Sequence, residues 1–154
     1  MEELIVDAWE IHNRIGIFFL SGIEEPALQD SAAKRGRTVA DHFSHIHNVR
    51  LMWLKSAAPD LLEGVTKIEK TDLIGKDALV SALTESGAAM AALFRKSLSE
   101  EGKVKGFKPN AIAFLGYPVS HESFHMGKID MTLRLSDHSV DDKTHYGMWE
   151  WGVR

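Results

Sequence analysis

Apolar residues recur at spacings of three and four along four long segments of the sequence, a period typical of amphipathic helices. The segments cover about residues 3–23, 38–57, 76–99 and 110–135. The strict alternation of apolar and polar residues that indicates a half-buried strand is almost absent. Four amphipathic helices in a chain of 154 residues predict an all-α fold, a four-helix bundle.

The boundaries of these segments bear on how the helices are arranged. Thr38 and Asp41 fit a capping box at the start of the second helix. The connection 58–75 is long enough to cross the length of a bundle, so the second and third helices need not form an antiparallel hairpin. Pro118 lies inside the fourth segment, where it either kinks the helix or marks its true start.

The same spacing predicts which side chains face the core. In the first helix these are Leu4, Ala8, Ile11, Ile15, Phe18 and Phe19. In the fourth helix they include Ile112, Leu115, Ile129 and Leu133. From residue 137 onward the chain is expected to be irregular, up to an aromatic end at 146–151.

Composition narrows the class of protein. With 44% hydrophobic residues the chain can bury a sizeable core, and residues 1–154 are predicted to form one domain. The net charge is −4 and basic residues are scattered, which argues against a nucleic-acid partner. The longest apolar run, at 15–20, is far shorter than a membrane span, and the acidic N-terminus does not resemble a secretory signal. A soluble, cytoplasmic protein with no membrane partner is expected.

The distribution of histidines is the strongest chemical signal in the sequence. The stretch HESFH places His121 and His125 one helical turn apart, so that both imidazoles can reach one metal ion. In the stretch HFSHIH, His42 and His45 share a helix face, whereas His45 and His47 do not. Because the chain has no cysteine, a metal site needs His, Asp or Glu. Three imidazoles from two facing helices would leave coordination positions open, as catalytic zinc sites do.

HESFH also fits the His-Glu-x-x-His pattern of zinc proteases. The extended form of that pattern fails, because Lys128 stands where glycine belongs and Met131 where the third histidine belongs. Glu150 is a candidate for a distant third ligand, but the chain offers no strand on which a peptide substrate could align. On a regular helix Glu122 points about 100° away from the histidine pair. It is interpreted as a solvated carboxylate or one that lies outside the ligand set, and a protease is disfavoured.

The other polar and aromatic residues have simpler interpretations. Arg50 and Asp41 are expected to form a solvated pair, and Trp53 is expected in the core. Trp149 and Trp151 are expected to seal one end of the bundle or a contact between subunits. Three histidines are expected on the surface or hydrogen-bonded in the core: His12, His138 and His145.

Two segments and the C-terminal end resemble a known family. RTVADHFSHIHNVRLMWL, at 37–54, has a histidine followed eight residues later by an aromatic residue, as His45 and Trp53. HESFHMGKIDMTLRL, at 121–135, and the end YGMWEWG, at 146–152, complete the match. The chain resembles the DinB/YfiT-like superfamily of metal-binding four-helix bundles. The matching residues of the second segment are His121, His125, Gly127, Ile129, Leu133 and Arg134. The chain departs from the family pattern at three positions that are not metal ligands in it: Phe124, Met126 and Lys128.

This resemblance implies a metal site made of His45, His121 and His125, which would bind a divalent ion such as zinc or nickel. It also implies a long crossover between the second and third helices, a homodimer and a small-molecule substrate. Some members of the superfamily transfer a low-molecular-weight thiol, of the bacillithiol or mycothiol kind, to an electrophile.

Three neutral imidazoles leave a divalent ion its full charge, and such an ion can deprotonate a coordinating thiol. The chain has no thiol of its own, so a sulfur nucleophile must come from outside the protein. The sequence-based hypothesis is therefore a cofactor thiol held as a thiolate at the metal and attacking a small electrophile. Hydrolysis by a metal-bound hydroxide at the same site and a purely structural metal site are the alternatives.

Overall fold

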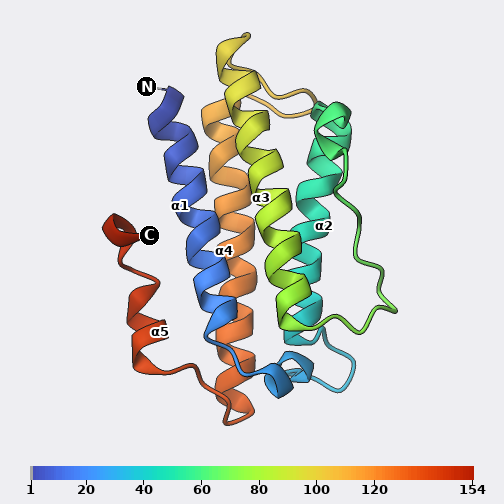
Figure 1. The fold of residues 1–154 in the computed structure, drawn as a ribbon, viewed down its shortest axis with the longest axis vertical. Helices are drawn as coiled ribbons and strands as arrows, with labels where there is room; N and C mark the ends of the chain where they lie inside the picture. Colours follow the sequence, from blue (N-terminus) through green and yellow to red (C-terminus); the bar gives the residue numbers. More distant parts are fainter. Residues whose placement is uncertain (1) are drawn as a thin grey trace.

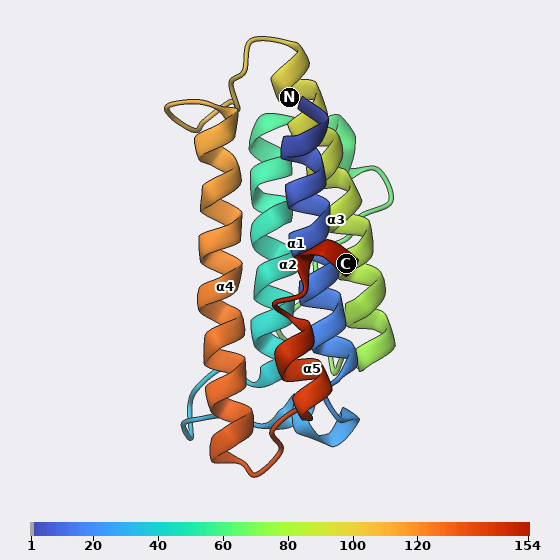
Figure 2. The same cartoon turned by 90° about the vertical axis from the view of Figure 1, so that its left-hand side faces the viewer.

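The computed structural model describes residues 2–154 and contains four long helices that lie side by side (Figure 1, Figure 2). They are α1 (Glu2–Ser21), α2 (Val39–Ala57), α3 (Lys76–Ser99) and α4 (Ala111–Leu135). Within the described residues there is no β-strand, and the one β-type pairing is an isolated bridge between Ser31 and Thr38. The all-α class predicted from the sequence is confirmed.

The structure also contains shorter helical elements that the sequence analysis did not predict. They are α5 (Asp142–Gly147) and the 3-10 turns η1 (Glu25–Gln29), η2 (Pro59–Leu62) and η3 (Trp151–Val153). The expectation that the chain is irregular after residue 137 is therefore wrong. Asp141 caps α5, because its carboxylate accepts a hydrogen bond of 2.8 Å from the backbone N–H of Thr144.

The starts of α2 and α4 are fixed by side-chain caps. The hydroxyl of Thr38 accepts from the backbone N–H of Asp41 at 3.1 Å, and the carboxylate of Asp41 accepts from the backbone N–H of Thr38 at 2.9 Å. The predicted capping box is thus confirmed, and it engages Asp41, which does not pair with Arg50. Asn110 caps α4, which continues through Pro118, so Pro118 does not mark the start of this helix.

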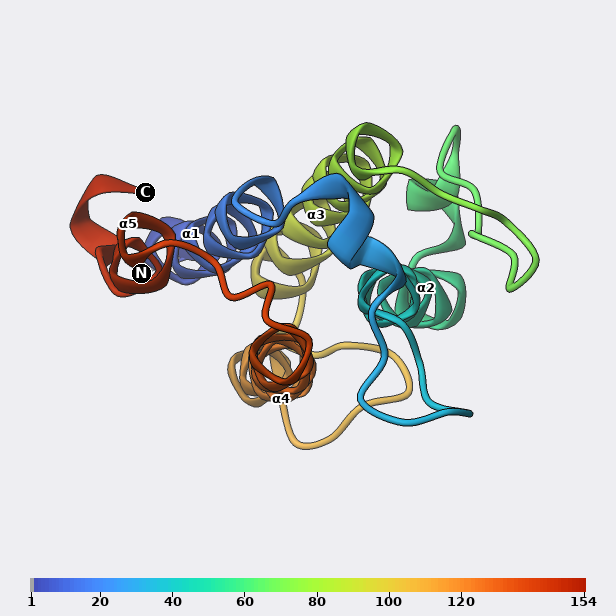
Figure 3. The same cartoon turned by 90° about the horizontal axis from the view of Figure 1, so that it is seen from below.

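The connection 58–75 determines the relative direction of α2 and α3. In Figure 1 the chain ascends along α2, returns beside that helix through 58–75, and ascends again along α3. α1 and α4 run in the opposite direction. Seen along the helices, α3 lies between α1 and α2, and α4 lies across from α3, where it contacts α1 and α2 (Figure 3). No helix within 2–154 is long and apolar enough to cross a bilayer.

The buried side chains form two apolar clusters, one toward each end of the helices. One cluster includes Phe19, Phe43, Leu83, Ile129 and Leu133. The other includes Trp9, Leu54, Met90, Phe94 and Phe114. Residues whose positions in their helices fall between the two clusters are mostly polar, and they include the candidate site.

Two residues assigned to the core from the sequence are on the surface. Leu4 is 69% exposed and Ile112 is 59% exposed. The buried face of α1 is instead formed by Val6, Trp9, His12, Ile15, Phe19 and Leu20. Both misplaced residues lie in the first turns of their helices, where fewer neighbouring elements are available to cover a side chain.

Candidate metal centre

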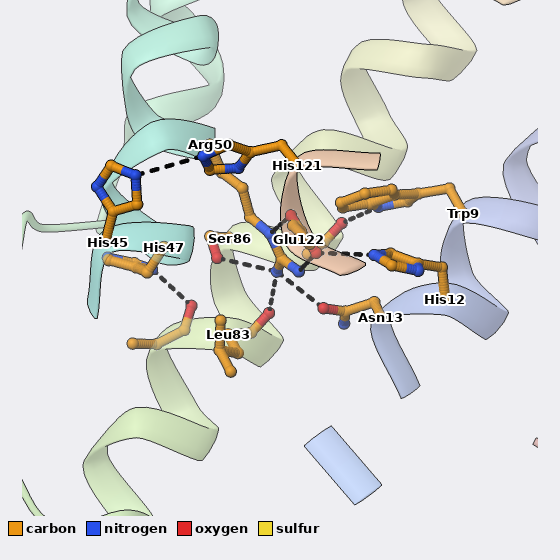
Figure 4. Close-up of polar contacts among 12 residues, drawn as sticks. Trp9, His12, Asn13, His45, His47, Arg50, Leu83, Ser86, His121 and Glu122 are labelled. Carbon is orange, nitrogen blue, oxygen red and sulfur yellow. Dashed lines mark hydrogen bonds and ion pairs between the residues drawn. The ribbon is translucent and has the colours of Figure 1, made fainter. Parts of the chain in front are cut away.

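Three histidines from two helices converge between α2 and α4. His45 projects from α2, and His121 and His125 project from successive turns of α4. The Nε2 atoms of His45 and His121 are 3.3 Å apart, and Figure 4 shows these two rings facing each other. The His125 ring lies 4.7 Å, between centroids, from each of the other two. One nitrogen from each histidine lies within 4.8 Å of the other two, so the three side chains can bind one metal ion.

The spacing of one pair of these nitrogens matches what a tetrahedral ion requires. Zinc binds imidazole nitrogen at about 2.0–2.1 Å, so two ligands at a tetrahedral angle lie about 3.3–3.4 Å apart. The separation of 3.3 Å between His45 and His121 has this length. Among residues 2–154 the donor set consists of three imidazoles, which suits zinc and other first-row divalent ions.

A fourth histidine, His42, contacts one of the three candidate ligands. Its Nδ1 atom is 2.9 Å from Nδ1 of His125, and the two rings are buried. When the Nδ1–H group of His125 donates to His42, the Nε2 atom of His125 carries a free lone pair and can bind a metal. His42, which shares a helix face with His45, is thus placed to orient a ligand and lies outside the ligand group itself.

The histidines of this cluster are held in the neutral form. Burial lowers the pKa of His45 to about 4, with further contributions from Arg37 and the neighbouring imidazoles. Burial, His121 and His45 lower the pKa of His125 to about 3. Burial also lowers the pKa of His42. It lowers the pKa of His121, although the charge of Glu122 acts in the opposite direction. At neutral pH each of these rings therefore carries no charge and has one unprotonated nitrogen that is available to a cation.

Histidine titration in the metal-free protein tests this electrostatic account. We expect the rings of His45 and His125 to remain neutral well below pH 6.5, because protonation would add charge to a partly desolvated cluster. His138 is the internal control, since the hydrogen bond to Asp30 raises its pKa. Proton chemical shifts followed by NMR should show His138 titrating first as pH falls. Titration of His45 and His125 near 6.5 would contradict the prediction.

Arg50 and Glu122 form a buried ion pair beside the histidines, since Glu122 directly follows His121. The guanidinium of Arg50 donates two hydrogen bonds of 2.7 Å to the carboxylate of Glu122, in the planar two-point geometry that arginine favours (Figure 4). Each of the two residues is only 3% exposed. The interpretation of Glu122 as a solvated carboxylate is therefore wrong, and so is the assignment of Arg50 to a solvated pair with Asp41.

The ion pair is the centre of a hydrogen-bonded network that joins all four long helices. Nε2 of His12 lies 2.9 Å from the Glu122 carboxylate. Arg50 also donates to the side chains of Asn13 and Ser86 and to the carbonyl of Leu83, while the Trp9 ring lies against its guanidinium (Figure 4). Burial would raise the pKa of Glu122. The charge and hydrogen bonds of Arg50, together with the hydrogen bond from His12, instead lower this pKa to about 2.

This network fixes the two helices that carry the candidate ligands. Arg50 lies on α2, five residues after His45, and Glu122 on α4 directly follows His121. A bidentate contact at this level restrains both the separation and the relative rotation of α2 and α4. The sequence does contain a signal that Arg50 is buried, because Arg50 falls four residues after Ile46 and four before Leu54 on the buried face of α2.

The remaining residues singled out in the sequence have structural roles. The ring nitrogens of His47 lie 3.0 and 2.9 Å from the carbonyl oxygens of Ala82 and Thr66. Trp53 packs edge to face against Phe107, Phe114 and Tyr117, as expected for the core. His12 is hydrogen-bonded in the core and His138 contacts Asp30 on the surface, as predicted for these two.

The C-terminal residues differ in part from what the sequence predicted. Trp149 is 76% exposed, and together with Trp151 and His145 it lines a cavity of about 260 Å³ beside α1 and α4. These tryptophans therefore do not seal an end of the helices, and the other role predicted for them, a contact between subunits, stays a prediction. Glu150 does not belong to the histidine cluster and instead pairs with Arg154 at 3.1 Å. Glu150 is therefore not the third ligand that the protease arrangement needs.

Comparison with known proteins adds nothing to this geometry. No protein-family model matches the chain, and no curated protein matches it. The function must therefore be inferred from the site itself.

Proposed function

We propose that the protein is a metal-dependent enzyme of the DinB/YfiT-like type, in which a divalent ion at His45, His121 and His125 promotes attack by an external thiol on a small electrophile. The observation that carries this proposal is the convergence of the three ring nitrogens, with a pair separated by the edge length of a tetrahedral site. The parallel course of α2 and α3, joined by 58–75, fits the four-helix bundle with a long crossover that this class of protein requires.

Residues of the chain supply a rigid, neutral set of donors. His42 orients His125 through its Nδ1 contact, and the Arg50–Glu122 pair holds α2 against α4. Zinc and nickel are the ions we propose, since both accept imidazole ligands. A divalent ion bound there would act as a Lewis acid, lowering the pKa of a coordinated thiol or water.

A cavity that reaches His45 favours chemistry over a purely structural role. His45, alone of the three candidate ligands, lines this cavity of about 500 Å³, which is large enough to admit a small molecule. A structural ion would be enclosed by protein ligands on all sides. The sulfur nucleophile is proposed to come from a low-molecular-weight thiol because the chain contains no cysteine.

A reconstituted assay tests the proposal. Zinc- or nickel-loaded protein is mixed with an alkylating substrate such as monobromobimane, with and without an added thiol. We expect thioether formation above the uncatalysed background rate to need both the metal and the thiol. This excess rate should fall by more than about 100-fold in His121→Ala, because losing a ligand should cost more than losing a hydrogen-bond partner of a ligand. His138→Ala, at the surface, is the matched control.

Each of the other outcomes identifies an alternative. Consumption of the substrate at the same rate without thiol would replace the transferase proposal by hydrolysis at the same site. Equal rates of thioether formation in the wild type and His121→Ala would show that the three histidines do not carry the reaction.

A further inference from the structure

The cavity beside His45 is lined by several cationic side chains that the proposed metal site does not need. It is bounded by the segment 35–38 before α2, by the first turns of α2 as far as Asn48, and by 67–74 of the long connection. Its volume is about 500 Å³. Four of its lining residues are cationic: Arg35, Arg37, Lys67 and Lys70.

The carboxylates of the same cavity already have partners. Asp41 is engaged in the capping box with Thr38. Glu69 pairs with Lys67 at 3.1 Å, and Asp72 accepts a hydrogen bond from the backbone N–H of Glu69. By contrast, no ion pair within residues 2–154 involves Arg37, and its side chain is exposed. The cavity therefore offers a cationic group with free donors.

Arg37 and the candidate ligand His45 line the same cavity. Arg37 lies directly before Thr38, the capping residue of α2, and His45 lies about two turns into that helix. One small molecule in this cavity can therefore contact both Arg37 and the ion proposed at His45.

We propose that Arg37 binds an anionic group, a carboxylate or a phosphate, of the thiol or the electrophile whose reacting atom lies at His45, His121 and His125. This inference rests on the proposed function and adds the class of substrate to it. Arginine suits the role because its planar guanidinium binds either anion through two parallel hydrogen bonds. The cavity lining carries its four cationic side chains against the three carboxylates of Asp41, Glu69 and Asp72, and the excess of one positive charge favours an anionic substrate over a cationic one.

Cobalt-loaded protein provides a test with a readout other than activity. Binding of a thiolate to cobalt produces a charge-transfer absorption band, so a dissociation constant can be measured for each thiol without any reaction. The probes are mercaptopropionate, mercaptopropanol and cysteamine, which end in a carboxylate, a hydroxyl and an ammonium group. We expect the carboxylate thiol to bind about tenfold more tightly than the neutral one, as one charge-assisted contact allows, and cysteamine to bind most weakly.

Substitutions separate the role of Arg37 from that of the metal. In Arg37→Gln the preference for the carboxylate should disappear, while Arg37→Lys should retain part of it. Lys55→Gln removes the same charge from an exposed position of α2 that does not line the cavity, and it should leave the preference unchanged. A preference that persists in Arg37→Gln arises at the metal and would overturn the inference.

The proposed function and this inference fail in different ways. If all three thiols give the band with similar affinity, the thiol proposal stands and Arg37 binds no anionic group of the thiol. Binding of inorganic phosphate then decides whether Arg37 binds an anionic group of the electrophile. If no thiol gives the band, the thiol proposal fails, and binding of inorganic phosphate to the metal-free protein then decides the inference. Calorimetry should in either case detect phosphate binding that Arg37→Gln weakens, and equal or absent binding in the two proteins would exclude an anion site at Arg37.

Discussion

Replacing Glu122 by alanine should lower the free energy of unfolding by about 3–5 kcal/mol, the cost of leaving a buried charge without its partner. Glu122→Ala removes both hydrogen bonds of 2.7 Å from the guanidinium of Arg50, which stays enclosed between four helices. Asn13, Ser86 and the Leu83 carbonyl continue to accept from Arg50, but none of them is an anion. Urea unfolding in the presence of a chelator measures the loss.

The chain supplies a matched control for this experiment. Glu10 and Arg95 form an ion pair of 2.8 Å on the surface, so Glu10→Ala should cost no more than about 1 kcal/mol. Replacing both members of the buried pair, as in Arg50→Met with Glu122→Met, should recover most of the loss, because no uncompensated charge remains. A Glu122→Ala variant as stable as Glu10→Ala would contradict the assignment of the buried pair.

The pH dependence of stability provides a second readout of the same contact. The pKa of Glu122 is about 2 in the folded protein and lies at its ordinary, higher value when the chain is unfolded. Because the folded-state pKa is depressed, the pair contributes its full stability above the ordinary carboxyl pKa and loses it as pH falls toward 2. Acidification through this range should destabilise the wild type more than the variant with both methionines.

Zinc ions should raise the free energy of unfolding of the wild type by about 4 kcal/mol when free zinc is near 1,000 times its dissociation constant. The stabilisation arises because the three ring nitrogens meet only in the folded protein. In His125→Ala the stabilisation should be lost, since two nitrogens remain and His42 has no ligand to orient. The quantity to compare is the shift between zinc-treated and chelator-treated samples of each variant.

This comparison removes the effect of the substitution itself on folding. His125→Ala also opens space in a buried cluster, so the metal-free variant is expected to be less stable than the wild type whatever the metal does. His138→Ala, which alters only a surface contact with Asp30, should show the full zinc-induced shift. A shift of equal size in His125→Ala would place any zinc effect elsewhere in the chain.

Much of the fold could be predicted from the sequence because the four long helices have strong local signals. Thr38 with Asp41 and the apolar period beginning after Lys76 gave helix boundaries that agree with the structure. α5 was missed because six residues are too few to show a helical period, although Asp141 is a recognisable cap. Leu4 was misplaced because periodicity does not show where along a helix its neighbours end.

The parts of the candidate site that depend on local spacing could be predicted from the sequence, whereas the contacts between distant residues could not. The four-residue spacing of His121 and His125 is local, and it correctly indicated that both rings lie on one face of α4. The pairing of Arg50 with Glu122 joins residues far apart in sequence, and no local pattern specifies such a contact. Each charge taken alone is expected at the surface, because buried charges are rare unless they are paired.

The central claim, that one divalent ion binds at His45, His121 and His125, is tested most directly by elemental analysis of protein purified without a histidine tag. The wild type and His138→Ala should each contain about one ion per chain, whereas His45→Ala, His121→Ala and His125→Ala should contain almost none. Equal metal content in all five proteins would contradict the claim.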